Sequence, residues 1–414
     1  MDKDNTKSTF TEYLIPLNYE KMLQQIQHLN LDKYVKKLDS ITTAKLFIFA
    51  QLTQIKSYTD IQMKLIQAEK LQQSLGLKSI SISQLSRKFR DMDDAFLEAV
   101  FKDLVQQVSS RLGVRQTNEK LGRIHLIDSS TISLCVKKYR WAEFRKTKAG
   151  IKLHQRIIYC DEGMYPDEAI LTPAKPADKT QMDALVVTDP DALNVFDRGY
   201  LDYRKFDHYS KNKIRFVTRL KSNANVEVIQ EHSVQPGSLI LREATVRLGN
   251  KNTYLMEMPL RLIECLDGEG ELVRILTNDF CLTTDEISDV YRKRWQIELF
   301  FKWMKQHLHI KGCYGTSKTA VYNQIRVALI TFCLTLLTKL KTRYRGSLLT
   351  VLKCLSNAWD QAYQAFKDAL FREPTRSSAG RRKVDHERIF AETLHQYEEG
   401  TIDHLDDLTI DPIL

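Results

Sequence analysis

Apolar residues recur three and four positions apart along most of the first 120 residues. Residues 18–39 and 42–77 show this spacing most clearly, and few glycines or prolines interrupt them. The spacing places apolar side chains on one face of an α-helix. The pattern therefore predicts that residues 1–120 form a helical region.

Within this region, residues 79–96 combine a serine-rich turn with a helix that carries Gln84, Arg87 and Arg90. A turn followed by a helix with polar, basic side chains is typical of the DNA-reading helix of a helix-turn-helix. A surface helix with charged residues explains the same segment. The segment alone leaves both interpretations open, and the surface helix is favoured.

The hydrophobic pattern changes near residue 121. Short apolar runs without helical spacing occupy residues 123–128, 154–160, 192–197 and 214–220, and such runs predict buried strands. Residues 225–285 predict further strands, with a turn at 267–270. Helical spacing returns from residue 284, and helices are expected from there on, apart from a basic link at 372–383 and an acidic tail at 398–411.

Composition narrows the class of protein. The 414 residues are 43% hydrophobic and 28% charged, which is typical of globular domains. The net charge of +10 favours a polyanionic partner. Seven cysteines form no C-x-x-C pair, so neither a disulfide framework nor a zinc site is expected. The longest apolar stretch, 327–337, is too short for a membrane span of about 20 residues and predicts a buried helix.

The basic residues form two clusters. Residues 137–156 hold eight lysines and arginines and one acid, Glu143, and residues 211–221 hold five with no acid. A run of charge is usually a solvated surface. Because both clusters flank the predicted strands, a phosphate-binding surface is the more specific interpretation.

Two aspartates follow predicted strands. Asp128 comes after the apolar run 124–127, and Asp197 after the run 193–196. Carboxylates at strand ends lie on a rigid frame, which suits binding of a hard divalent cation. An Asx turn that closes the strand also explains each aspartate, and for either one alone it is the favoured explanation.

A third acid, Glu298, shares a predicted helix with Tyr291, Arg294 and Lys305. At about 100° per residue, these four side chains fall within an arc of about 60° and form one polar stripe. Apolar residues occupy the rest of the helix and are expected to be buried. An exposed helix with an Arg294–Glu298 salt bridge is the simpler interpretation.

A more specific interpretation joins the three acids. Convergent carboxylates need a counter-charge, because their repulsion would otherwise raise a pKa. Two Mg²⁺ ions about 3.5–4 Å apart would supply it, and would activate an attacking oxygen at a phosphodiester. The cations of the stripe would then hold DNA phosphates.

These residues resemble the bacterial insertion-sequence transposases of the DDE type, in the group marked by the signature Tyr-x2-Arg-x3-Glu-x6-Lys. Tyr291, Arg294, Glu298 and Lys305 fit this spacing at every position. Residues 127–132 resemble the motif around the first acid, 141–154 the block after it, and 196–203 with 216–223 the region of the second acid. The resemblance extends over residues 123–312, and the N-terminal helical segment resembles the leader domain of this group less specifically.

The resemblance implies an α/β fold: a ribonuclease-H-like core with a β-rich insertion between the second and third catalytic acids, and helical regions at both ends. The domains implied are an N-terminal DNA-end-binding domain at 1–120, a catalytic core at 121–224 and 286–345, an insertion at 225–285, and a C-terminal helical region with an acidic tail at 346–414.

The resemblance also implies a function, cut-and-paste DNA transposition. The enzyme would cut DNA at terminal inverted repeats and join the free 3′ ends to target DNA. Asp128, Asp197 and Glu298 would hold two Mg²⁺ or Mn²⁺ ions, and a homodimer would pair two DNA ends. The residues expected to contact DNA are Tyr291, Arg294, Lys305, Lys137, Lys138, Arg140, Arg145, Lys146, Lys148 and Arg198.

Two other functions remain open on the sequence: a structure-specific nuclease on the same fold, which cuts without joining, and an inactive DNA-binding relic. An RNA-binding module would need exposed stacking aromatics, of which the sequence gives no clear sign. The polar N-terminus carries no signal peptide, so a cytoplasmic, nucleoid-associated protein without a membrane partner is expected.

Overall fold

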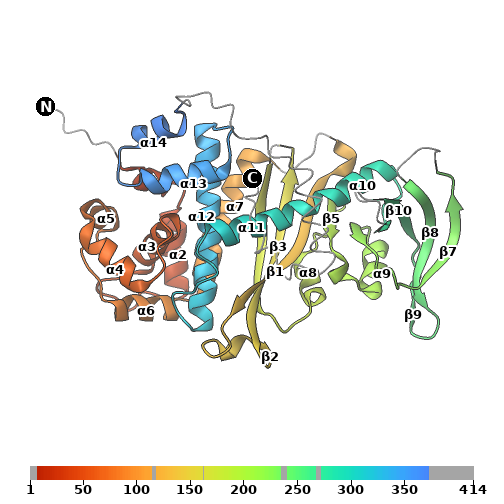
Figure 1. Ribbon diagram of the computed structural model, residues 1–414, viewed down its shortest axis with the longest axis horizontal. Helices are drawn as coiled ribbons and strands as arrows, with labels where there is room; N and C mark the ends of the chain where they lie inside the picture. The colour runs from red at the N-terminus through yellow and green to blue at the C-terminus, as the bar shows by residue number, and fades with distance from the viewer. Residues whose placement is uncertain (1–6, 114–117, 162, 235–239, 267–271, 373–414) are drawn as a thin grey trace, which may run out of the picture.

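The computed structural model describes residues 7–113, 118–161, 163–234, 240–266 and 272–372. A lobe of helices lies at one end of the molecule and a large sheet at the other, and helix α11 (Trp295–His307) runs between them (Figure 1). The acidic tail at 398–411, the last helix expected from the sequence and the turn at 267–270 lie outside the described residues.

The N-terminal lobe forms from amphipathic helices with polar N-caps. Serine, asparagine and aspartate side chains accept backbone N–H groups at most of their starts, and Ser81 forms a full capping box with Gln84. The helices are α1 (Thr9–Tyr13), α2 (Tyr19–His28), α3 (Ser40–Leu52), α4 (Tyr58–Gln67), α5 (Glu69–Leu75), α6 (Ile82–Asp91) and α7 (Asp94–Leu112).

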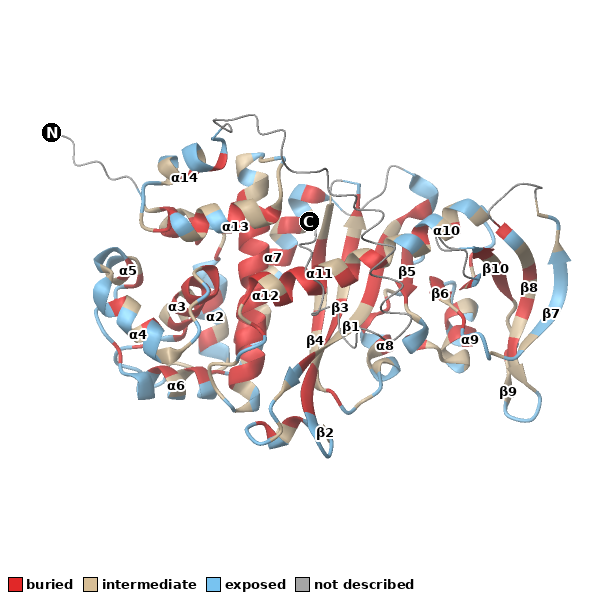
Figure 2. Cartoon of the chain, viewed as in Figure 1, coloured by how far each residue is buried: buried red, intermediate tan, exposed pale blue. Residues whose placement is uncertain are grey.

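The centre of this lobe is α12 (Lys318–Thr342), which packs against α3, α6, α7 and α13 (Leu348–Asn357). This helix is long and apolar enough to cross a membrane, but its most apolar 18-residue window is completely buried (Figure 2). The stretch 327–337 is therefore a buried helix, as predicted. The last described helix, α14 (Tyr363–Leu370), packs against α1 and α13.

The first five long strands form a mixed sheet in the order β4-β3-β1-β5-β6. Strands β3 and β4 are antiparallel to their neighbours, while β1, β5 and β6 run parallel. A short strand, β2, pairs with the start of β3 and forms a hairpin. The strands are β1 (Arg123–Leu134), β2 (Glu143–Arg145), β3 (Lys148–Cys160), β4 (Gly163–Pro173), β5 (Ala192–Phe196) and β6 (Arg215–Arg219).

The strands of residues 226–277 continue the same sheet. Strand β11 pairs with β6, and the order continues β11-β10-β8-β7, with β9 on β8. Apolar side chains of these strands share a buried cluster with β5 and α9 (Tyr203–Lys211). The strands are β7 (Val226–His232), β8 (Ile240–Asn250), β9 (Tyr254–Leu255), β10 (Leu260–Leu266) and β11 (Leu272–Thr277).

Helices cover both faces of the parallel strands. Successive side chains of a strand point to opposite faces, so Leu126 joins the core under α10 (Thr284–Lys293) and α11 (Trp295–His307), while Ile127 joins the core under α8 (Met182–Leu185) and α9 (Tyr203–Lys211). Helices therefore bury both faces of these strands, and the polar groups lie at the ends of the strands.

The N-terminal lobe also forms hydrogen bonds with the backbone at the end of α11. The Gln51 side chain donates to the His309 carbonyl oxygen (3.1 Å) and accepts from the His309 N–H (2.8 Å). The Gln54 amide donates to the carbonyl oxygen of His307 (2.8 Å). Phe300 and Trp303 of α11 meet the Phe332 ring of α12 edge-on, with centroids 5.1 and 5.2 Å apart.

Candidate active site

Asp128 and Asp197 follow equivalent positions on neighbouring parallel strands. The pairing of β1 with β5 ends at Ile127 and Phe196, so each aspartate is the next residue along its strand. The expectation that Asp128 ends its strand is wrong, because β1 continues to Leu134 through antiparallel pairing with β3. Asp128 instead lies where the parallel partner ends and the sheet opens.

Glu298 reaches Asp128 through a shared arginine. The Arg294 Nη1 lies 2.6 Å from Glu298 Oε1 and 3.3 Å from Asp128 Oδ2. Asp197 also acts electrostatically on both Asp128 and Arg294. Residues that lie far apart in the sequence thus converge on one guanidinium.

The helix that carries Glu298 is wound more tightly at Arg294, where the Arg294 N–H donates to the Tyr291 carbonyl oxygen (3.0 Å) and the Ile297 N–H donates to the Arg294 carbonyl oxygen (3.1 Å). Helix α10 ends at Lys293, α11 begins at Trp295, and Arg294 lies between them with φ −53° and ψ −33°. The polar stripe is not exposed. Glu298 and Lys305 retain only 6% and 8% of their accessible surface, so the expectation of an exposed helix is wrong, whereas the Arg294–Glu298 salt bridge of that interpretation does form.

Burial and charge act together on the site. Burial raises the pKa of Asp128 well above its usual value; the nearby Arg294 opposes this rise, and the charges of Glu298 and Asp197 add to it. Burial disfavours the charged form of Arg294, but Glu298 and the other acids outweigh it, so its pKa stays well above the usual value. Tyr291 lies with its ring 5.8 Å from the Arg294 guanidinium, and burial raises its pKa to about 12.

The donor set is chemically suited to a hard divalent cation, since carboxylate oxygens are the ligands that Mg²⁺ prefers. In the described part of the chain, however, no group of three or more His, Cys, Asp or Glu residues is arranged to hold a metal ion. The Arg294 guanidinium lies between Asp128 and Glu298 and contacts both. It is the positive charge that the three acids require.

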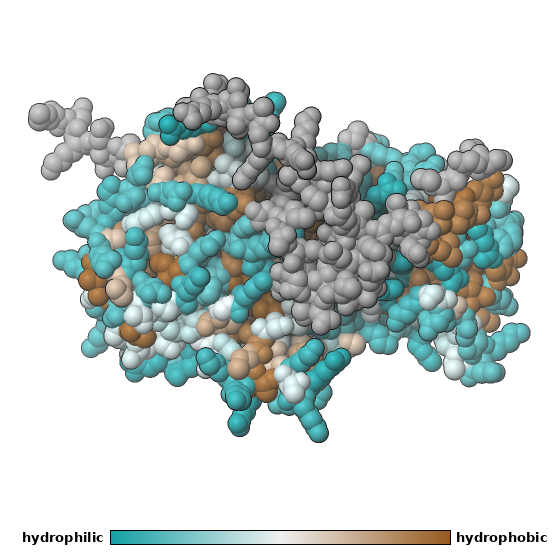
Figure 3. All heavy atoms as spheres, viewed as in Figure 1, coloured by the Kyte–Doolittle hydropathy of each residue, from teal (hydrophilic) through white to brown (hydrophobic). Residues whose placement is uncertain are grey.

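The expected DNA-contacting cations of the β2–β3 region lie on the surface. All six are exposed, and within the described residues they form no ion pair; they are Lys137, Lys138, Arg140, Arg145, Lys146 and Lys148. The β2–β3 hairpin projects from the body of the molecule, and its surface is hydrophilic (Figure 3). Arg198 is likewise exposed, at the start of the short 3-10 helix η4 (Arg198–Tyr200).

Other basic residues of the two clusters are paired with acids. Lys152 pairs with Asp178 (2.9 Å) and Arg156 with Asp167 (2.6 Å). In the second cluster, Lys211 pairs with Glu257 and Arg215 with Asp279, at 2.6 and 2.7 Å. The clusters are therefore only partly available to phosphates.

Sequence reasoning missed a polar network behind Asp128. Ser129, Lys152, Asp178 and Tyr200 meet on the opposite face of β1 from Glu298. Asp178 lies on a loop without periodicity, in the 3-10 helix η3 (Asp178–Gln181). One sequence feature could have indicated part of this network: side chains alternate between the two faces of a strand, so Ser129 points to the opposite face from Asp128.

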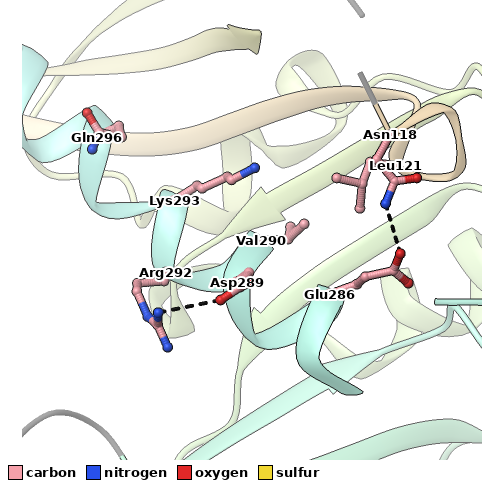
Figure 4. Close-up of a pocket in the computed structure, with 8 residues that line it drawn as sticks. All are labelled: Asn118, Leu121, Glu286, Asp289, Val290, Arg292, Lys293 and Gln296. Carbon is pink, nitrogen blue, oxygen red and sulfur yellow. Dashed lines mark hydrogen bonds and ion pairs between the residues drawn. The ribbon is translucent and has the colours of Figure 1, made fainter. Parts of the chain in front are cut away.

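A separate pocket of about 400 Å³ lies beside α10 (Figure 4). Its walls carry both charges, with an Asn118–Glu286 hydrogen bond (2.8 Å) and an Arg292–Asp289 ion pair (3.4 Å). None of the three acids lines it. The pocket is thus not the site that Arg294 organises.

Carboxylates gathered at the open end of parallel strands are the arrangement expected of enzymes that act on phosphodiesters with divalent ions. Comparison with known families supports this class. The family model of the transposase DDE domain matches residues 119–334, slightly more than half of the chain, and a domain of unknown function matches residues 5–78. The chain belongs to the DDE transposase family.

Curated relatives agree with the family. A Sinorhizobium fredii protein assigned as transposase y4zB is 31% identical over 240 residues, which are 57% of this chain and 66% of that protein. A Geobacillus stearothermophilus protein, assigned as the transposase of insertion sequence element IS5377, is 29% identical over 63% of this chain and 67% of its own length. The matched region thus spans about two thirds of each relative.

One solved structure is also similar, the piggyBac transposase synaptic complex with hairpin DNA. It covers 98% of this chain and 88% of its own, with a TM-score of 0.44 and 10% identity. A similarity at this level carries no argument about function.

Proposed function

We propose that this chain is a cut-and-paste transposase of an insertion sequence. It cleaves DNA at terminal inverted repeats and joins the resulting 3′-hydroxyl ends to target DNA. The observation that carries the proposal is the meeting of Asp128 and Glu298 on Arg294 beside Asp197. Three acids that lie far apart along the chain would not share one buried counter-charge unless the fold requires them together.

The three acids would hold two divalent ions, Mg²⁺ or Mn²⁺. Such ions, when bound, activate the attacking oxygen and stabilise the leaving oxygen of the phosphodiester. The protein's own part is to keep the carboxylates converged on a rigid sheet and helix. Arg294 would move from the acids to a DNA phosphate as the ions enter, because a guanidinium binds phosphate oxygens as well as carboxylates.

DNA would bind along the exposed cations. The β2–β3 hairpin supplies most of them, and Arg198 adds one at the end of β5. Tyr291, Arg294 and Lys305 would contact the backbone nearest the cut. The exposed side chains of α6, Gln84, Arg87 and Arg90, are the natural place for the N-terminal lobe to meet the transposon end. The same chemistry would require two copies of the chain on paired ends, acting on nucleoid DNA in the cytoplasm.

The domain assignment is part of the proposal. Residues 121–224 and 286–345 would form a ribonuclease-H-like core, which the strand order β4-β3-β1-β5-β6 supports. Residues 225–285 would be an insertion that extends the same sheet, residues 1–120 the end-binding domain, and residues 346–414 the C-terminal region.

The substitution Glu298→Gln tests the proposal. Loss of a metal-binding carboxylate removes several kcal/mol of transition-state stabilisation, so cleavage should fall by at least about 10³-fold. The full chain would be incubated with Mg²⁺ and DNA carrying the ends that flank its gene, and the products mapped on a sequencing gel. Glu257→Gln is the matched control, because Glu257 is exposed at the far end of the sheet.

The outcomes separate the alternatives. Nicks at the repeat boundary, dependent on Glu298 and followed by joining to target DNA, support transposition. Cleavage without joining would favour a structure-specific nuclease. DNA binding without cleavage in Mg²⁺ or Mn²⁺ would favour an inactive relic. Loss of DNA binding in Glu298→Gln would show that Glu298 is structural.

A further inference from the structure

A fourth carboxylate stands behind the three acids, on the opposite face of β1. Asp178 Oδ1 accepts hydrogen bonds from the Ser129 hydroxyl (2.6 Å) and from Lys152 Nζ (2.9 Å). Lys152 also donates to the Pro176 carbonyl oxygen (3.3 Å), so it ties the η3 loop to β3. Lys152 therefore balances the charge of Asp178, so that Asp178 adds little to the repulsion among the other three acids.

The network reaches Asp128 through one residue. The backbone N–H of Ser129 donates to Asp128 Oδ1 (2.7 Å), and the side chain of Ser129 donates to Asp178. Ser129 thus holds both carboxylates, one with its backbone and one with its hydroxyl. At this position β1 has lost its parallel partner β5, so the backbone needs another restraint on that side.

The same network approaches Asp197. A Cβ placed on Gly199 would lie 3.9 Å from Asp178 Oδ2 and 4.0 Å from Asp197 Oδ2, so both carboxylates face one small space. The Tyr200 hydroxyl is buried here and interacts with the Ser129 side chain. Burial raises the pKa of Tyr200 well above its usual value, and Asp128, Asp178 and Asp197 add to the effect. Tyr200 therefore belongs to the same polar network as Ser129 and Asp178.

We propose that Asp178 is a positioning residue of the metal-binding centre: held by Lys152, it fixes Ser129 and through it the direction of the Asp128 carboxylate. The proposal rests on the proposed function, since it assigns a support to the same three acids. A carboxylate is favoured here over an amide, because its charge balances the largely buried Lys152 ammonium. Residues that orient metal ligands typically change metal affinity by about 10–100-fold when removed.

The test is Mn²⁺ binding to the full chain without DNA, followed by electron paramagnetic resonance. The variants are Asp178→Ala, Asp178→Asn, Ser129→Ala and the double variant of Ser129→Ala with Asp178→Ala. Each alanine variant should raise the half-saturating Mn²⁺ concentration about tenfold. The double variant should raise it no further, because both changes break one chain of contacts. Asp178→Asn should fall between the wild type and Asp178→Ala.

Asp183→Asn is the matched control, because Asp183 lies on the adjacent α8, pairs with Lys205 (2.8 Å) and is 72% exposed. Its Mn²⁺ titration should equal that of the wild type. If Asp178→Ala does not fold, Asp178→Asn and Ser129→Ala still decide the question. The Mg²⁺ concentration for half-maximal cleavage should shift in parallel with Mn²⁺ binding.

Three results would overturn the proposal. An unchanged Mn²⁺ titration with a lowered melting temperature would make Asp178 purely structural. Lost binding in the Asp178 variants, with normal binding in Ser129→Ala, would make Asp178 a ligand rather than a support. If the wild type binds no Mn²⁺ and cuts no DNA, both the proposed function and the Asp178 proposal fail. If the wild type binds Mn²⁺ and cuts DNA but the variants do not behave as expected, only the Asp178 proposal fails.

Discussion

Arg294 is expected to hold the three acids together until a divalent cation replaces it. The perturbation is Arg294→Gln, which keeps a hydrogen-bonding side chain and removes the charge. The guanidinium lies 2.6 Å from Glu298 and 3.3 Å from Asp128, and the three side chains are 12%, 8% and 17% exposed, respectively. The substitution therefore removes the Arg294 charge from carboxylates that are largely buried.

The size of the effect follows from this geometry. At an effective dielectric constant of about 20, opposite unit charges about 4 Å apart attract by about 4 kcal/mol. Removing one partner of a buried ion pair typically costs about 3–5 kcal/mol. Unfolding entropy is about 2.1 cal/mol/K per residue, so each kcal/mol corresponds to about 1 °C in a chain of 414 residues. The melting temperature of Arg294→Gln without metal should fall by about 3–6 °C.

The assay is thermal unfolding in EDTA and in Mn²⁺. A cation that binds the same carboxylates stabilises the native state by mass action, and it need not displace the guanidinium in the variant. Mn²⁺ should therefore raise the melting temperature of Arg294→Gln more than that of the wild type. The control is Arg292→Gln, whose side chain is 65% exposed in a surface pair with Asp289 and should have little effect. A fall below about 1 °C in EDTA, or an equal Mn²⁺ effect in both proteins, would refute the reasoning.

Two further predictions concern the DNA surface and the core. Replacing Lys146 and Lys148 by glutamine should flatten the log–log salt dependence of DNA binding by up to about one unit each; the control Lys251→Gln should leave the slope unchanged, and an unchanged slope in the hairpin variant would remove both lysines from the interface. Burial lowers the pKa of His125 to about 3, with Arg156 and Arg123 adding to the effect. The unfolded state therefore binds the proton first, and the melting temperature should fall as the pH drops from about 6.5 toward 3. His125→Asn should weaken this dependence, whereas the exposed His28→Asn should not; equal pH profiles for the wild type and His125→Asn would contradict the assignment.

The sequence was informative where spacing alone fixes geometry. The signature interval between Arg294 and Glu298 is one helical turn, and the structure brings these two side chains into contact. The apolar runs before Asp128 and Asp197 predict strands, and both strands form. The pairing of β1 with β5, which places the two aspartates side by side, is a long-range contact that no local pattern contains.

The sequence was least informative for residues whose partners lie far away. Lys152 belongs to the basic cluster at 137–156, which predicts a phosphate-binding surface. Its side chain instead points inward and pairs with Asp178. Glu298 and Lys305 lie opposite apolar residues, which left an exposed stripe as the simpler of two interpretations, but both residues are buried. Periodicity identifies one buried face of a helix and cannot show that a second layer covers the other.

The hydrogen bonds of Gln51 and Gln54 at the end of α11 link two parts of the chain that match different family models. The N-terminal match ends at residue 78 and the transposase match begins at residue 119, yet α3 holds the helix that carries Glu298. A displacement of the N-terminal lobe would therefore shift α11 and, with it, Glu298. Exchange of this lobe between related proteins should therefore preserve activity only when both glutamines, or an equivalent clamp, travel with it.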